Sequence, residues 1–353
     1  MTGEGTQIGG AGFLFNTGPD GRCDDAKVGG AMMRWNPVLN KYCIWYYGRS
    51  KDFPKDMAPA LGSGSIALMT SDDGRDWTRV EGPLMGGAVM VPSDDPSAFD
   101  SVHLGTGDIT FENGLWHHWY YGGDAGNPKP GDPIYGFPGY RLHAGLAVSP
   151  DGILWQRKPG KGPGGALVGL GGEVYAAFPN VYRLGDRTIL QVTLKDRDFR
   201  GWITRVWQSE DQENWALLGP LTWSDDARNY DSAGMITRQV LHNIPGAAAE
   251  WMMIYTAVDG RPEMKEQRTI AIAVSDDGLT WRRQFDGPVF VAADKGAWDD
   301  YNVANPQVCV RGDELWMTYF GFADPQGPNA AQRGIGMAIS RSGDLHEFER
   351  ISA

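Results

Sequence analysis

Acidic side chains recur along the sequence, each near the beginning of a predicted strand. They are Asp24, Asp25, Asp100, Asp108, Glu173, Asp231, Asp299 and Asp300. Carboxyl groups that converge can exchange protons with a substrate or hold a hard cation such as calcium. These are therefore the residues from which we expect chemistry, provided that the fold brings them together.

Three of these acids share a sequence context and two others depart from it. Asp100, Asp231 and Asp299 each follow an aromatic residue. A residue repeated in this way commonly serves the repeat itself, for instance by capping a turn. Asp108 and Glu173 stand outside that context, and Glu173 is the one glutamate of the set. We therefore expect Asp108 and Glu173 to be the better candidates for chemistry.

Histidines cluster between positions 103 and 143, at His103, His117, His118 and His143. Metal ligation would need two or three of them on one site. Neighbouring side chains on a strand point to opposite sides, so His117 and His118 cannot both face inward. We therefore predict no metal site and expect structural histidines, with His103, close to Asp100 and Asp108, as the exception that could contact a ligand.

One turn motif recurs five times and indicates the elements that must position these residues. Its copies follow the form Ser-x-Asp-Gly-x-x-Trp, with some drift, and span 71–77, 149–155, 209–215, 275–281 and 340–348. Asp-Gly favours a tight hairpin because glycine adopts a positive φ without strain, and serine and aspartate side chains can bond the turn amides. Each copy follows a short apolar strand, and two further strands lie upstream of it.

Five units of four strands predict an all-β fold, a single five-bladed β-propeller with four-stranded antiparallel blades around a central channel. The blades are expected at 24–84, 97–158, 173–220, 229–290 and 297–352, and segment 7–16 could add a ring-closing strand. The Ser-x-Asp-Gly turns join strands 3 and 4 and so share one face. The innermost strands begin at the opposite face, here called the top face, where the long inserts also lie. The acids should therefore gather at the top mouth of the channel.

The charge balance is 32 basic against 44 acidic residues, a net of −12. Such a surface repels nucleic acid and anionic membranes, so the expected partner is a small-molecule or oligosaccharide ligand. The chain opens on no basic segment followed by an apolar stretch, and no apolar run approaches the ~20 residues of a membrane span. We expect a cytoplasmic protein, although the sequence leaves its compartment open. No cofactor is expected, with a calcium or other ion in the channel as the alternative.

The chain resembles the five-bladed propeller glycoside hydrolases of families 43, 32, 68 and 130, the arabinanase, levansucrase and invertase type. The resemblance rests on the aromatic-Asp-Ser segments, on the Trp-Tyr-Tyr-Gly strands at 45–48 and 119–122, and on the repeated hairpins. It implies Asp25, or Asp24, as base or nucleophile, Asp108 as the carboxylate that orients and tunes, and Glu173 as general acid. In that chemistry one carboxylic acid protonates the leaving oxygen, while a carboxylate activates water or attacks the sugar. A third negative group raises the pKa of the acid.

Further residues near the same mouth are expected to contact the substrate. They are Asp24, Asp100, His103, Asp231, Asp300, Asn305 and Tyr175. Tyr46 and Tyr120 are also expected there, because aromatic rings can stack on sugars.

The sequence therefore predicts a glycoside hydrolase-like enzyme that acts on a carbohydrate or glycoconjugate through a carboxylate cluster at the channel mouth. The Asp-Pro and Glu-Cys pairs common in those families are absent, since Ile109 follows Asp108 and Val174 follows Glu173. This departure supports an alternative, a propeller of the same superfamily used for a non-hydrolytic reaction on a small metabolite or for non-catalytic binding of a sugar or other ligand.

Overall fold

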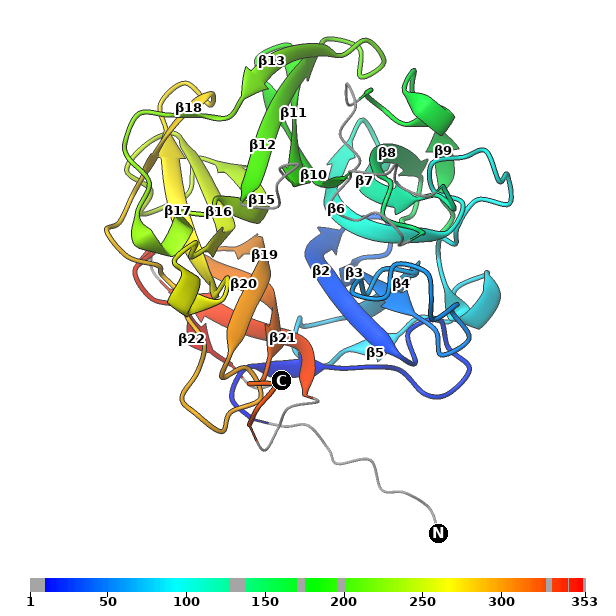
Figure 1. The fold of residues 1–353 in the computed structure, drawn as a ribbon, viewed down its shortest axis with the longest axis horizontal. Helices are drawn as coiled ribbons and strands as arrows, with labels where there is room; N and C mark the ends of the chain where they lie inside the picture. The colour runs from blue at the N-terminus through cyan, green and yellow to red at the C-terminus, as the bar shows by residue number, and fades with distance from the viewer. Residues whose placement is uncertain are drawn as a thin grey trace.

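The computed structural model describes residues 10–126, 138–169, 175–195, 201–327, 332–341 and 343–351. Its strands form five antiparallel sheets arranged as blades around a central axis (Figure 1). This arrangement confirms the predicted five-bladed propeller. No helix in the described ranges is long and apolar enough to cross a membrane.

Each blade is a meander of four strands, and the first strand of each contacts the first strands of its neighbours. Blade 1 comprises β2 (Lys27–Asn36), β3 (Lys41–Arg49), β4 (Ser65–Ser71) and β5 (Thr78–Arg79), and blade 2 comprises β6 (His103–Glu112), β7 (Leu115–Gly123), β8 (Leu142–Ser149) and β9 (Gln156–Lys158). Blade 3 comprises β10 (Ala176–Leu184), β11 (Arg187–Lys195), β12 (Trp202–Ser209) and β13 (Ala216–Pro220). Blade 4 comprises β15 (Met235–His242), β16 (Trp251–Val258), β17 (Arg268–Ser275) and β18 (Thr280–Arg283), and blade 5 comprises β19 (Asn302–Arg311), β20 (Glu314–Phe322), β21 (Arg333–Ser340) and β22 (Glu349–Arg350).

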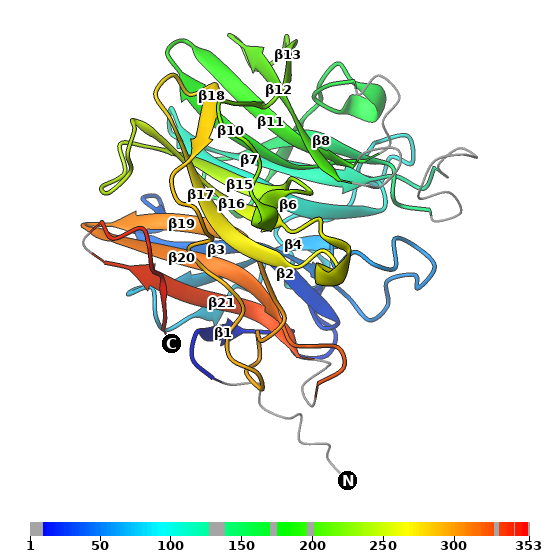
Figure 2. The same ribbon diagram turned by 60° about the vertical axis from the view of Figure 1, so that its left-hand side comes forward.

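Two short strands supplement the blades. β1 (Phe13–Phe15) pairs antiparallel with β21, so the N-terminal segment adds a strand to the last blade (Figure 2). β14 (Thr222–Trp223) pairs in parallel with β18. Because β21 also pairs with the C-terminal β22, both ends of the chain join one blade and close the ring. Short 3-10 helices lie in the connections: η1 (Met85–Gly87), η2 (Pro163–Gly165), η3 (Asn229–Asp231) and η4 (Pro262–Met264).

The repeated hairpins join strands 3 and 4 of their blades through local hydrogen bonds. In blade 4, Asp277 accepts bonds from the backbone N–H groups of Leu279 (2.8 Å) and Thr280 (2.7 Å), while Ser275 Oγ accepts one from Gly278 (2.9 Å). Burial raises the pKa of Asp277, but these N–H donors outweigh it and hold the pKa at about 2. The same aspartate contacts recur at Asp73, Asp151 and Asp211.

Apolar side chains fill the seams between blades. Trp45 of blade 1 and Trp116 of blade 2 pack with their ring centroids 4.8 Å apart. Trp119 of blade 2 meets Trp215 of blade 3 edge to face at 6.2 Å. Since each seam buries residues from both of its blades, a blade is stable only beside its neighbours.

Every innermost strand carries a β-bulge at a similar level of the ring. The first residues paired after it are Met32, Asp108, Asn180, Arg238 and Gln307. A bulge bends the strand and redirects its side chains. Four of the five positions are polar, so this level of the ring differs from the apolar seams around it.

Candidate functional site

Four of the predicted acids belong to one repeated structural unit. In blade 1, Asp24 accepts hydrogen bonds from the Tyr46 hydroxyl (2.7 Å) and from Arg79 Nε (2.9 Å). The unit recurs in blades 2, 4 and 5. Its members there are Asp100, Tyr120 and Arg157, then Asp231, Tyr255 and Arg283, and then Asp299, Tyr319 and Arg350. All four carboxylates are buried, and each fastens the start of its blade to strands 2 and 4.

In the described ranges, blade 3 does not have this unit. The register puts Val192 and Leu217 where the other blades have the tyrosine and the arginine. In blades 1, 2 and 5 the residue that follows the tyrosine pairs with a residue of the first strand. The repeated aspartate stands five positions before that first-strand residue in the sequence. In blade 3 that first-strand residue is Ala177, and in the sequence Gly172 stands five positions before it and is followed by Glu173. Glu173 lies outside the described residues, and its role stays a prediction.

Asp25 and Asp300, each next to a repeated aspartate, hold neighbouring loops. Asp25 accepts hydrogen bonds from the backbone N–H groups of Gly21 (2.8 Å) and Lys51 (2.7 Å), one with each carboxylate oxygen. Asp300 accepts an equivalent pair of backbone bonds at 2.6 and 2.8 Å. Both oxygens of each carboxylate are therefore engaged by the protein itself.

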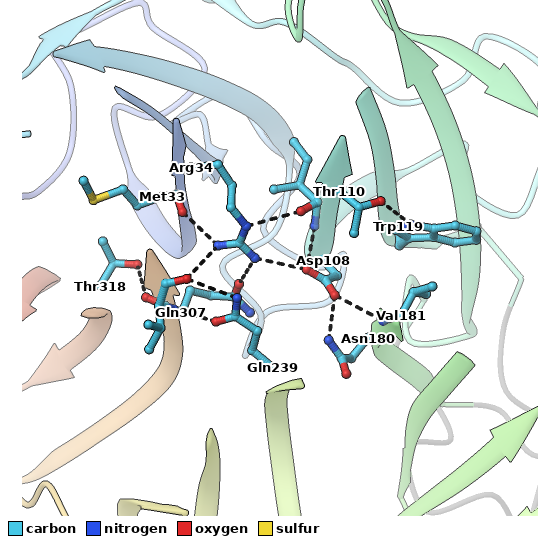
Figure 3. A network of polar contacts seen from close by, with 12 residues as sticks. Met33, Arg34, Asp108, Thr110, Trp119, Asn180, Val181, Gln239, Gln307 and Thr318 are labelled. Carbon is cyan, nitrogen blue, oxygen red and sulfur yellow. Dashed lines mark hydrogen bonds and ion pairs between the residues drawn. The ribbon is translucent and has the colours of Figure 1, made fainter. Parts of the chain in front are cut away.

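Asp108 lies in the middle of β6 rather than at the predicted top mouth (Figure 3). One of its oxygens accepts bonds from Ile109 N–H (2.8 Å) and Arg34 Nη2 (3.2 Å), and the other from Asn180 Nδ2 (2.6 Å) and Val181 N–H (3.1 Å). Burial raises the pKa of Asp108, whereas the Arg34 charge and the backbone donors lower it. The carboxylate thus connects blades 1, 2 and 3.

Arg34 extends this network to blade 5. Its guanidinium donates to Gln307 Oε1 (2.9 Å) and to the carbonyl of Val308 (3.4 Å). Gln239 of blade 4 exchanges two hydrogen bonds with the backbone of Val308, at 2.6 and 3.1 Å (Figure 3). We call Arg34, Asp108, Asn180, Gln239 and Gln307 the polar belt. It links the innermost strands of all five blades, because each residue comes from a different blade.

His103 is fully buried beneath the top loops. Its Nδ1 lies 2.9 Å from Ser63 Oγ, and its Nε2 lies 2.7 Å from the carbonyl oxygen of Gly139. Burial lowers the pKa of His103 to about 4, so the ring is neutral near pH 7. It ties the segment before β4 to the segment before β8.

Tyrosines from three blades approach one another near the top mouth. Tyr47 and Tyr121 are the second tyrosines of the two Trp-Tyr-Tyr-Gly strands, and Tyr175 precedes β10. Burial raises the pKa of Tyr121 well above its usual range, and the nearby Tyr47 and Tyr175 raise it further. Because side chains alternate along a strand, Tyr46 and Tyr120 point the other way, into the repeated units. The sequence analysis missed Tyr47 and Tyr121, although the doubled tyrosine signalled that one of each pair would face this side.

Asn305 and two aromatic rings complete the surroundings of these tyrosines. The Asn305 side chain lies beside Tyr47, whose pKa is raised to about 12 chiefly by burial. The Tyr121 ring meets Phe178 at 4.9 Å, and the Tyr175 ring meets Trp202 at 5.9 Å, both nearly edge to face. Two of the predicted substrate contacts, Tyr175 and Asn305, therefore belong to this group.

Basic side chains lie beside the tyrosines. The charges of Arg268 and Arg49 lower the pKa of Tyr47, against the larger rise caused by burial. Lys195 Nζ lies 4.1 Å from the centre of the Trp202 ring and 3.4 Å from Glu266. Among the described residues, no three His, Cys, Asp or Glu side chains converge to hold a metal ion. These side chains could bind a ligand through hydroxyl and amide hydrogen bonds, aromatic contacts and positive charge.

Comparison with known proteins identifies structures with a similar fold. No family model matches the chain, and no curated protein matches it. The structure resembles that of a glycoside hydrolase, with a TM-score of 0.61 and 15% identity over 94% of this protein and 92% of that one. It also resembles an N-acetylgalactosamine deacetylase from F. plautii in complex with blood group B trisaccharide, with a TM-score of 0.62 and 14% identity over 96% of both proteins.

A third similar structure is a glycoside hydrolase from the GH130 family of mannoside phosphorylases, which targets β-1,2 mannosidic linkages in Candida mannan. Its TM-score is 0.62 at 14% identity over 95% of both proteins. This protein shares their five-bladed propeller. GH32 and family-43 glycoside hydrolases match at 12–13% identity, so the likeness spans several families and singles out none. The predicted resemblance to five-bladed glycoside hydrolases is thus confirmed at the level of architecture.

Proposed function

We propose that this protein is a carbohydrate-acting enzyme, of glycoside hydrolase type, whose substrate binds at the top mouth of the propeller. One observation carries the proposal: Tyr121 and Tyr175 pack in one buried cluster there, and Tyr47 of a third blade lies near both of them. Tyrosine offers both an apolar ring face and a hydroxyl, which suits a ligand whose rings are apolar on their faces and polar at their edges. Carbohydrates have this character.

Glu173 is the general acid in this proposal. It precedes β10, whose start lies next to Tyr175. Blade 3 has Val192 and Leu217 in place of the tyrosine and arginine that bind the repeated aspartates. An acid at the start of blade 3 is therefore not needed for that structural unit. A general acid must hold a proton near neutral pH, which shielding from water favours.

The roles proposed for Asp108 and Asp25 follow from their contacts. Each oxygen of Asp108 already accepts two hydrogen bonds, and each oxygen of Asp25 accepts one from the backbone. We therefore assign Asp108 to positioning the innermost strands around the site and Asp25 to positioning a top loop. In the described ranges the other predicted acids also bond protein groups, although one buried oxygen of each of Asp24, Asp100 and Asp299 has no hydrogen-bond partner there. This favours, as the second candidate, a non-hydrolytic or purely sugar-binding propeller.

A substrate panel with a Glu173→Gln variant tests the proposal. Wild-type protein should cleave one or more glycosides, and Glu173→Gln should lower turnover of substrates with poor leaving groups at least ~10²-fold while binding persists. Activated aryl glycosides need little protonation and should suffer less. Glu210→Gln, in the exposed hairpin of blade 3, is the matched control and should keep full activity.

Two results separate the candidates. Wild-type protein that binds saccharides but cleaves none of the panel would leave the binding or non-hydrolytic function. A Glu173→Gln variant with undiminished turnover of poor-leaving-group substrates would show that another group is the acid.

A further inference from the structure

Basic residues stand at the top ends of several strands without carboxylate partners. Lys27 begins β2, Arg49 ends β3 and Arg268 begins β17. Within the described ranges, no carboxylate oxygen of an Asp or Glu lies within 4.0 Å of a side-chain nitrogen of any of the three, so none of them forms an ion pair there. The arginines of the repeated units, by contrast, are all ion-paired. In a protein whose net charge is −12, three cations at one mouth that have no carboxylate partner in the described part of the chain call for a cause.

Arg49 is held rigidly by carbonyl groups. It is 5% exposed, and its Nε and Nη1 donate to the carbonyls of Ser63 (2.9 Å) and Ala58 (3.0 Å). Its Nη2 has no hydrogen-bond partner in the described part of the chain. Carbonyl groups satisfy donors but carry no net charge, so the positive charge of Arg49 is fixed in place without a counter-ion among the described residues.

Arg268 brings a second charge into the tyrosine group. Its backbone N–H is bonded to Asn302 Oδ1, and its Nε has no partner among the described residues. The side chain is half-buried, and burial lowers its pKa, while the charge of Glu266 and then the neighbouring Tyr175 and Tyr47 oppose that change. Arg268 is therefore partly accessible to a ligand. It lies near Tyr175 and Tyr47 of the proposed sugar site.

The cations also repel one another. Burial lowers the pKa of Lys27, and the charges of Arg49 and Arg333 lower it further. Glu266, whose charge acts on Arg268, forms its ion pair with Lys195. Unpaired like charges in a desolvated place destabilise a protein, so their retention points to a ligand of opposite charge. Clefts with charge of one sign also attract such ligands from solution.

We propose that the saccharide bound at this mouth carries an anionic substituent, and that Arg268 and Arg49 bind it. The inference rests on the proposed function and narrows it to acidic sugars. A carboxylate on a sugar ring suits arginine in particular, because a guanidinium offers two parallel N–H donors to its two oxygens. The tyrosines and Asn305 would then contact the neutral part of the same ligand.

Calorimetric binding of matched sugars tests this proposal. The probes are a galacturonic acid trimer and a glucuronate-containing disaccharide, each beside its neutral galactose or glucose counterpart, with inorganic phosphate as a separate arm. At low salt the acidic sugar should bind about 10- to 100-fold more tightly, the value of one charge-assisted contact. The preference should shrink as salt is raised.

Variants assign the preference to the mouth. Arg268→Gln should remove most of the preference by weakening the acidic sugar far more than the neutral one, while Arg268→Lys should keep part of it. Arg75→Gln, an exposed arginine on the hairpin of blade 1, is the matched control and should change nothing. Thermal melts report whether each variant folds, and the salt titration of the wild type needs no variant.

The outcomes are distinct. Equal binding of neutral and acidic sugars, or a preference unaffected by Arg268→Gln in a folded protein, overturns the inference while the proposed function stands. Binding of inorganic phosphate through Arg268 with no binding of any sugar overturns both, because the anion would then be the ligand by itself. A salt-sensitive, Arg268-dependent preference for the acidic member of each pair supports both.

Discussion

Replacing Asp108 by asparagine asks whether the polar belt holds the ring together. The carboxylate accepts four hydrogen bonds, two with each oxygen. Asparagine keeps one acceptor oxygen and sets an NH2 group against the other two donors, so two bonds are lost whichever way the amide turns. Arg34 also loses the one carboxylate with which it forms an ion pair in the described structure.

The size of the effect follows from these contacts. Each buried donor left unsatisfied costs about 1–3 kcal/mol, and removing one charge of a buried pair costs about 3–5 kcal/mol. Arg34 keeps its bonds to Gln307 and to backbone carbonyls, so the losses do not simply add. We expect Asp108→Asn to lower the free energy of unfolding by about 3–5 kcal/mol. With an unfolding entropy of about 2.1 cal/mol/K per residue, a protein of this length should melt about 4–7 °C lower.

Calorimetry and urea unfolding measure this change. Asp313→Asn, in the exposed turn between β19 and β20, is the control and should stay within about 0.5 kcal/mol of wild type. Combining Asp108→Asn with Arg34→Met closes a double-mutant cycle, and a coupling of about 0.5–3 kcal/mol is expected for residues in contact. Unchanged stability of Asp108→Asn together with lost saccharide turnover would refute the structural role and restore the predicted catalytic one.

The repeated hairpins give two further predictions. Asp277→Ala removes the bonds to Leu279 and Thr280 and should lower the free energy of unfolding in urea by about 0.5–2 kcal/mol, as for a lost cap. Sugar binding should not change. Loss of binding in a folded variant would contradict the separation of the hairpins from the site. The pKa values of Asp73 and Asp277 lie at about 2, below the ~3.9 of an unfolded aspartate, so the stability that these carboxylates contribute is present above about pH 4 and lost as the pH falls toward 2. Urea midpoints between pH 5 and 2.5 should therefore fall more steeply for wild type than for the Asp73→Asn, Asp277→Asn double variant, and parallel curves would disprove the pKa argument.

The hairpins and hence the number of blades could be predicted from sequence because their bonds are local. Ser275 and Asp277 satisfy N–H groups no more than three residues away, so the same few residue types must recur wherever the turn recurs. Five copies of such a turn, with strands on either side, determined the architecture without any knowledge of tertiary contacts.

The roles of the acids could not be predicted in the same way, because their partners are distant in the sequence. Asp24 is engaged by Arg79, which is 55 residues away, and Asp108 by Arg34, which is 74 residues away. Both aspartates were predicted near strand starts, yet Asp24 fastens a blade to its own outer strand, while Asp108 lies mid-strand and joins three blades.

The top mouth shows the same division between sequence and tertiary structure. The sequence by itself determined that Tyr46 and Tyr47 lie on opposite faces of β3, since side chains alternate along a strand. Only the tertiary structure decided which face meets Asp24 and which meets Tyr121 and Arg268. The physical reason is that the packing of one blade against the next sets the environment of each face. The unpaired charge of Arg49 likewise depends on which carbonyls and carboxylates the folded protein brings to it.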